Sequence, residues 1–153
     1  RIDTVEPLVL PVNLITIKQQ EDLRNKELPS GVTEMYMKYP RSLFEAIRQV
    51  ETGGEEDPSE AVGDGGLSIG PYQISKAYWQ DSIMHHPEIG GTYQDCKDKT
   101  YSEWIMMSYW DRYAKPDCSL ETLARIHNGG PRGHFKTATL PYWKKVESYL
   151  GTD

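Results

Sequence analysis

Two acidic residues lie where a helical pattern gives way to a glycine-rich loop, one before the change and one after it. Glu51 closes an apolar-patterned stretch just before Gly53-Gly54, and Asp64 lies within Gly63-Asp64-Gly65-Gly66. Hydrolysis of a glycosidic bond uses two carboxyl groups that face the scissile bond, one of which is protonated at the working pH. Glu51 and Asp64 are therefore candidates for that pair.

A helix is predicted to position Glu51. Apolar residues recur at the spacing of one helix face, at Leu43, Ala46, Ile47 and Val50. Gly53-Gly54 ends this helix, so Glu51 lies at its carboxyl end beside the apolar stripe. Both the negative end of the helix dipole and the apolar wall would raise the pKa of Glu51, as a general acid requires. The plainer alternative is a surface glutamate near a helix end.

The remaining pattern predicts further helices and one small hairpin. Ser75 and Ser119 are candidate N-caps, and Pro141 suits a first helical position. Glycines punctuate the hairpin candidate, Ala61–Ile74. The further helices are expected at Ser75–Ser82, Tyr101–Tyr113, Ser119–His127 and Pro141–Leu150.

Two blocks of sequence resemble the invertebrate-type lysozymes, the family that includes destabilase. The first is Val50-Glu51-Thr52-Gly53 with Ser68-Ile69-Gly70-Pro71-Tyr72-Gln73-Ile74, and the second runs from Ala124-Arg125-Ile126-His127-Asn128-Gly129-Gly130-Pro131 to Tyr142-Trp143. The resemblance covers residues 43–150. It implies a lysozyme-like α+β fold, mainly helical, with a small β-hairpin flanking the active-site cleft. Residues 41–153 would form this domain, and residues 1–40 a partly extended N-terminal extension.

The resemblance implies a muramidase that cleaves the β-1,4 MurNAc–GlcNAc bond of peptidoglycan with Glu51 as general acid. Asp64 is displaced by one residue, because the family's catalytic aspartate falls on Gly63. The Gly-Asp loop is also similar to goose-type lysozymes, in which the aspartate is thought to position a water. Asp64 could thus be nucleophile, charge stabiliser or general base, or could merely form an Asx turn.

A second set of residues carries a minor alternative. In destabilase-like members, a serine matching Ser68 and a histidine matching His127 are linked to isopeptide hydrolysis, as a nucleophile and its base. Gly66 occupies the family's other serine position. The plainer role for His127 and Asn128 is hydrogen bonding to the sugar N-acetyl group or to loop backbone.

Several residues near these motifs are candidate substrate contacts. Tyr72 and Gln73 are expected to line the cleft floor, and Tyr78 is either a core or a subsite residue. Asn128 and Gly129 would let the backbone approach the glycan. A non-catalytic lysozyme-like module that binds glycan or another protein remains the alternative to an enzyme, because fold does not guarantee activity.

Composition limits the partners. The chain of 153 residues has a net charge of -6, which argues against nucleic acid as the main partner. No run is long enough to span a bilayer. The histidines and cysteines show no metal-ligand spacing, and no phosphate-loop pattern is present, so neither a metal nor a cofactor is expected. Residues 1–40 could bind a partner chain.

The two cysteines, Cys96 and Cys118, are few for a family whose members are rich in disulfides. A Cys96–Cys118 disulfide and two free thiols are both consistent with the sequence. Secretion or a lytic, vesicular compartment is expected from the resemblance, while the low cysteine content leaves an intracellular location open.

Overall fold

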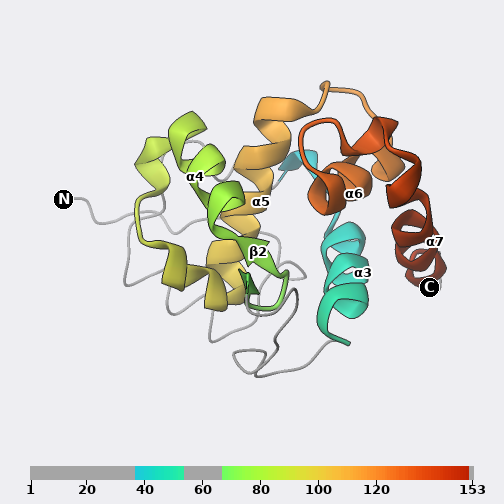
Figure 1. The fold of residues 1–153 in the computed structure, drawn as a ribbon, viewed down its shortest axis with the longest axis horizontal. Coiled ribbons are helices and arrows are strands. Elements are labelled where there is room, and N and C mark those ends of the chain that lie inside the picture. Colours follow the sequence, from blue (N-terminus) through green and yellow to red (C-terminus); the bar gives the residue numbers. More distant parts are fainter. Residues whose placement is uncertain (1–36, 54–66, 152–153) are drawn as a thin grey trace.

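The computed structural model describes residues 37–53 and 67–151. Most of the extension expected at 1–40, the first part of the expected hairpin and Asp64 lie outside the described residues. The described part is mainly helical with one small antiparallel pair of strands, as the sequence predicts (Figure 1).

The helices begin and end close to the positions that the sequence indicates. They are α3 (Arg41–Thr52), α4 (Lys76–His85), α5 (Lys99–Tyr113), α6 (Leu120–Gly129) and α7 (Leu140–Tyr149). Four short 3-10 helices, which the sequence analysis missed, connect them within the described ranges: η4 (Pro87–Ile89), η5 (Tyr93–Lys97), η6 (Gly133–Phe135) and η7 (Thr137–Thr139).

Local capping signals explain this agreement. Ser75 and Ser119 each accept a hydrogen bond from a backbone N–H in the first turn of α4 and α6, respectively. Gly53 ends α3 in the left-handed conformation, with φ of 65°. Pro141 lies in the first turn of α7. These residues fix the helix ends independently of tertiary packing.

Helix α5 is the centre of the fold. Every residue from Thr100 to Trp110 is buried, and the ribbon shows α5 running between α4 on one side and α3 with α6 on the other (Figure 1). The ring of Trp110 packs against Phe44 of α3 at 5.5 Å and against Tyr39 at 5.2 Å between centroids. A helix buried all round needs covering elements on every face.

A charged network crosses this core. Glu103 of α5 is almost fully buried and forms an ion pair with Arg41, the first residue of α3. The Tyr72 hydroxyl donates to Glu103 Oε2 at 2.5 Å. Burial and the adjacent Glu103 charge raise the pKa of Tyr72, so the phenol stays protonated and remains a donor. The network joins α3, the hairpin turn and α5.

The hairpin is short. Strands β1 (Ser68–Ile69) and β2 (Ile74–Ser75) pair Ser68 with Ser75 and Ile69 with Ile74. The turn between them holds Gly70 at φ of 83°, and a Cβ there would lie 1.9 Å from the Cys96 carbonyl oxygen. Only glycine fits this close approach of the turn to η5.

The cysteines are not joined to each other: Cys96 and Cys118 are both free thiols. Burial raises the pKa of the Cys96 thiol to about 12, so it behaves as an apolar core group. Among the described helices, none is long and apolar enough to cross a membrane.

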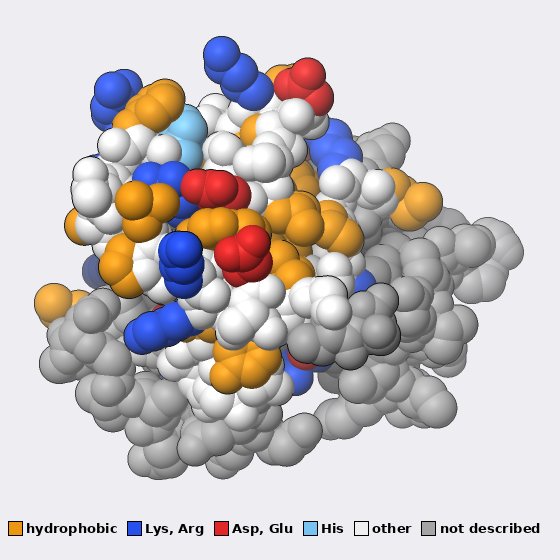
Figure 2. All heavy atoms as spheres, turned by 90° about the vertical axis from the view of Figure 1, so that its right-hand side faces the viewer, with side chains coloured by type: hydrophobic (Ala, Val, Ile, Leu, Met, Phe, Trp, Pro, Cys, Tyr) orange, Lys and Arg blue, Asp and Glu red, His pale blue; other side chains and the backbone are white. Residues whose placement is uncertain are grey.

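Figure 2 shows the face that bears α7, where basic side chains surround a band of apolar ones. Exposed apolar residues of this C-terminal part include Phe135, Leu140 and Tyr149. Lys144 and Lys145 are exposed on α7 itself. This face therefore combines exposed apolar and basic side chains.

We expect Arg41→Met to lower the free energy of unfolding by about 3–5 kcal/mol, because the variant leaves Glu103 buried without its cation. Urea unfolding measures this loss. Arg112→Met is the matched control, since Arg112 meets Asp81 at 3.9 Å near the surface, and such pairs contribute about 0–1 kcal/mol. Equal losses for the two variants would contradict a central role for the buried pair.

Candidate active site

Glu51 occupies the last turn of α3, where the sequence places it. Its neighbours along the helix, Leu43, Phe44, Ala46 and Ile47, are buried. About a fifth of the Glu51 side chain, 18%, is exposed to solvent. The carboxyl group therefore lies at the edge of the core, reachable from solvent yet backed by apolar and aromatic side chains.

One carboxyl oxygen of Glu51 is held from two other helices. The Tyr142 hydroxyl of α7 donates to Glu51 Oε2 at 2.8 Å. His127 Nε2 of α6 lies 3.6 Å from the same oxygen. Burial and the adjacent Glu51 charge raise the pKa of Tyr142, so its hydroxyl stays protonated. These contacts fix the rotamer of Glu51.

His127 is a neutral, fully partnered imidazole. Its Nε2 donates to the Tyr72 carbonyl oxygen at 3.0 Å, and its Nδ1 accepts from the Tyr78 hydroxyl at 2.9 Å. Burial lowers the pKa of His127 to about 4. Since a carbonyl only accepts, the proton of the neutral ring belongs on Nε2, the atom that faces Glu51.

Two of the predicted substrate contacts lie behind the site. Tyr72 has no exposed surface, and Tyr78 is buried against Tyr109, with ring planes 12° apart and centroids at 3.8 Å. The Tyr72 carbonyl oxygen and the Tyr78 hydroxyl hold His127, and the Tyr72 hydroxyl ties the hairpin turn to Glu103. Their contribution to the site is therefore positional.

The other predicted contacts differ in accessibility: the amide oxygen of Gln73 is buried and its nitrogen donates to the Gly70 carbonyl at 2.9 Å, whereas Asn128 is exposed. Gln73 is half-buried and has φ of 52°, a left-handed conformation that is unusual for a residue with a side chain. Asn128 is exposed at the end of α6. Gly129 has a packing reason to be glycine, because a Cβ there would lie 2.5 Å from the Thr139 methyl group.

The contacts of His127 bear on the predicted Ser68–His127 nucleophile–base pair. Ser68 is buried in β1, where it pairs with Ser75 of β2. Both ring nitrogens of His127 are engaged, by Tyr78 and by the Tyr72 carbonyl. A general base needs a nitrogen that can take the serine proton, so the geometry favours a supporting role for His127.

The basic residue nearest to Glu51 along α3 is used elsewhere. Arg48 donates to Glu45 Oε1 at 2.7 Å and 3.2 Å. Asp64, the expected second carboxylate, lies outside the described residues.

Comparison with known proteins identifies the family to which this chain belongs. Residues 42–149 match the Destabilase family. The chain belongs to that family. A lysozyme of Meretrix lusoria is 38% identical over 91 residues, which cover 57% of this chain and 71% of that protein. Invertebrate-type lysozyme 6 of Caenorhabditis elegans is 36% identical over 94 residues, covering 54% and 67%.

Solved structures agree with the sequence relatives of this Destabilase-family chain. The inhibitor-bound lysozyme of Meretrix lusoria has a TM-score of 0.61 and 30% identity, over 74% of this chain and 93% of that one. The lysozyme of Tapes japonica has a TM-score of 0.62 and 30% identity, over 73% and 91%. The Destabilase-family chain is a lysozyme-type hydrolase with a lysozyme-like fold, as its sequence motifs predict.

Sequence reasoning missed the residue that holds Glu51. Tyr142 is part of the second block that resembles the invertebrate-type lysozymes, yet nothing in its local pattern links it to a residue on α3. Only the packing of α7 against α3 brings its hydroxyl to the carboxyl group.

The lowered pKa of His127 predicts a pH-dependent stability term. Below its ordinary pKa of about 6.5 the unfolded chain binds a proton that the folded chain refuses until about pH 4. The free energy of unfolding therefore falls by up to about 3 kcal/mol as the pH drops from about 6.5 to about 4.

His127→Gln removes that term along with the hydrogen bonds of the ring. We expect the variant to be less stable than the parent at pH 7. The difference between their free energies of unfolding should narrow as the pH falls from 6.5 to 4. Urea unfolding at several pH values measures both proteins. Between pH 7 and 8 the gap should be constant, which is the internal control. A gap that is equally wide at pH 4 and pH 7 would contradict the neutral, buried assignment.

Proposed function

We propose that this protein is a muramidase that cleaves the β-1,4 bond between N-acetylmuramic acid and N-acetylglucosamine in peptidoglycan, with Glu51 as general acid. The observation that carries the proposal is the setting of Glu51. Its carboxyl group is partly exposed at the end of α3, and one of its oxygens is fixed by the Tyr142 hydroxyl beside a neutral His127. The relatives named lysozymes support the same reaction class.

The reaction assigns a role to each carboxyl group. Protonated Glu51 gives its proton to the leaving glycosidic oxygen as the C–O bond breaks, and the sugar develops oxocarbenium character. Asp64 is the second carboxylate, which stabilises that charge, forms a covalent adduct or activates water. Water finally supplies the hydroxyl group of the new reducing end and returns a proton to Glu51.

Tyr142 and His127 support Glu51 without exchanging protons themselves. A raised pKa keeps the Tyr142 phenol protonated, and a lowered pKa keeps His127 neutral above about pH 4. The proposal therefore assigns the proton transfer to Glu51 alone among these three residues. Positioning of this kind contributes to rate because a displaced acid cannot reach the leaving oxygen.

Substrate contacts are proposed for Gln73 and Asn128. Asn128 is exposed, and its amide suits the N-acetyl and hydroxyl groups of an amino sugar. The Gln73 amide nitrogen donates to the Gly70 carbonyl oxygen at 2.9 Å, so a contact through Gln73 requires its amide to turn toward the sugar. The backbone at Gly129 lies beside Asn128. Peptidoglycan as substrate implies secretion or delivery to a lytic compartment. Residues 1–40 are proposed as an additional surface for a protein partner.

The isopeptidase alternative has weaker support. It needs His127 as the base for Ser68, whereas both ring nitrogens already have partners. Glycoside hydrolysis makes no such demand of His127.

Clearing of a peptidoglycan suspension tests the proposal. We expect clearing by the parent between about pH 4 and 8, and a loss of at least about a hundredfold in Glu51→Gln, because the amide cannot give the proton. Glu147→Gln is the matched control, since Glu147 is exposed on α7. A folded parent that clears nothing at any pH would point to the non-catalytic, glycan-binding alternative.

Asp64→Asn tests the second carboxylate in the same assay. We expect a large loss of clearing with an unchanged far-UV spectrum. The anomer first released, followed by NMR, then distinguishes the roles: retention implies an adduct or ion pair with carboxyl groups ~5 Å apart, and inversion an activated water at ~6.5–9.5 Å. Full activity of the variant would remove Asp64 from the mechanism.

Tyr142→Phe tests the contact that fixes Glu51. Removal of the hydroxyl leaves the ring packing in place, so we expect the fold to persist and kcat to fall roughly tenfold, equivalent to about 1.4 kcal/mol. Steady-state rates on a soluble glycan fragment measure kcat and KM separately. Tyr149→Phe is the control, because Tyr149 is half exposed at the end of α7. An effect confined to KM would instead indicate a binding role.

A further inference from the structure

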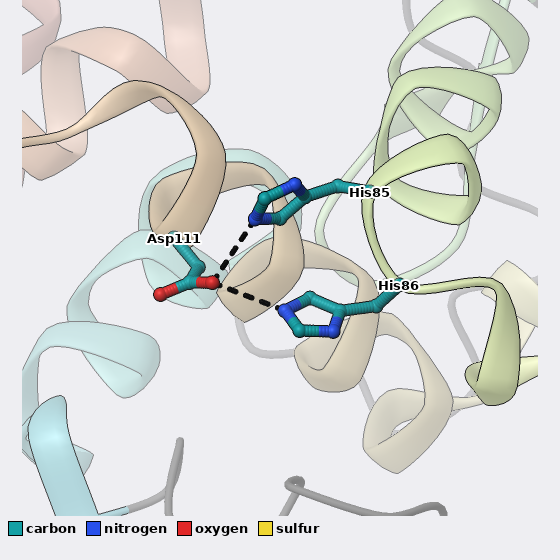
Figure 3. Close-up of side chains that lie close together, drawn as sticks. All are labelled: His85, His86 and Asp111. Carbon is teal, nitrogen blue, oxygen red and sulfur yellow. Dashed lines mark hydrogen bonds and ion pairs between the residues drawn. The ribbon is translucent and has the colours of Figure 1, made fainter.

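A second cluster of chemically active side chains lies away from Glu51. His85 is the last residue of α4, His86 follows it as the C-cap, and Asp111 lies near the end of α5. His85 Nε2 and His86 Nε2 each lie 3.0 Å from Asp111 Oδ2. Figure 3 shows both imidazole rings directed at the same oxygen of the Asp111 carboxylate, which reaches them from the neighbouring helix.

We propose that His85, His86 and Asp111 form a binding site for a zinc ion. One ligand atom from each residue lies within 4.8 Å of the others. Two imidazole nitrogens and a carboxylate oxygen are a ligand set that zinc accepts, with bonds of about 2.0–2.2 Å. Ligands on such a tetrahedral ion lie about 3.3 Å apart, so the two histidine–carboxylate spacings of 3.0 Å need only small shifts to admit the ion, and the two imidazole nitrogens lie within 4.8 Å of each other.

The surroundings of His86 match those of a metal ligand. Its other ring nitrogen, Nδ1, lies 2.7 Å from Glu88 Oε2. A carboxylate behind a histidine fixes the orientation of the ring and places a proton on the outer nitrogen, which leaves the inner nitrogen to face a metal. Glu88 is therefore the outer partner of His86, in the arrangement common at zinc sites.

The site is open on one side. The side chains of His85, His86 and Asp111 retain 34%, 24% and 27% of their exposure. An ion can enter from solvent, and water can supply the fourth ligand. The expected absence of a metal site rested on sequence spacing alone, and it overlooked Asp111 because only the packing of α4 on α5 brings that residue to the histidines.

Lys38 competes with the ion for the same carboxylate. Its Nζ lies 3.0 Å from Asp111 Oδ1, the oxygen that does not face the histidines. The contact holds the carboxylate in orientation, while its positive charge opposes a second cation nearby. A site with these features would bind zinc with moderate rather than extreme affinity.

Isothermal titration of zinc chloride into the full, tag-free chain tests the proposal, after removal of metal with a chelator. We expect one zinc per chain, and at least tenfold weaker binding in His86→Gln and in Asp111→Asn. His134→Gln is the matched control and should bind as the parent does, because His134 lies on η6, outside the cluster. Calcium chloride should give no comparable binding, since calcium prefers six to eight oxygen ligands.

Two further measurements keep the proposal falsifiable if a variant folds poorly. In NMR spectra of the parent, zinc should shift the ring signals of His85 and His86 but not those of His127. Lys38→Met, which removes an exposed side chain, should tighten zinc binding two- to tenfold. Absence of zinc binding by the parent, unchanged binding in His86→Gln, or weaker binding in Lys38→Met would overturn the proposed site.

Discussion

The buried carboxylate of Glu103 is the constraint on which the rest of the structure depends. A charge in the middle of an otherwise apolar helix is tolerated only when its partners are all in place. Arg41 and the Tyr72 hydroxyl are those partners, and they come from the start of α3 and from the hairpin turn. Satisfying Glu103 therefore fixes the relative positions of three elements.

The same constraint reaches the candidate site through Tyr72. Its hydroxyl is bound to Glu103, and its carbonyl oxygen accepts from His127. His127 in turn is held by Tyr78, whose ring stacks on Tyr109 of α5. Glu51 faces the end of this chain of contacts. The hairpin turn thus fixes where Glu51 lies relative to α5, although each strand of the sheet is only two residues long.

The sequence predicted those features whose cause is local. The caps Ser75, Ser119 and Gly53 set helix ends by short-range hydrogen bonds or backbone freedom, so the helices and the place of Glu51 followed from pattern alone. Tyr142 and Asp111 were not predicted as site residues. Each acts on a partner from another helix, and no sequence spacing encodes how two helices pack.

Glu103 and Glu51 show how helix packing gives two glutamates different surroundings, one structural and one suited to the proposed general acid. Both oxygens of Glu103 contact the guanidinium group of Arg41, in a buried ion pair that joins α5 to α3. The partners described for Glu51 Oε2 are a phenol hydroxyl and an imidazole that carries no charge above about pH 4. Arg48, one turn earlier on α3, is meanwhile held by Glu45. A carboxyl group in this setting is oriented without being tied to that arginine, which suits a proton donor. The division follows from helix packing: α5 brings Glu103 to a cation, whereas α6 and α7 bring Glu51 to neutral donors.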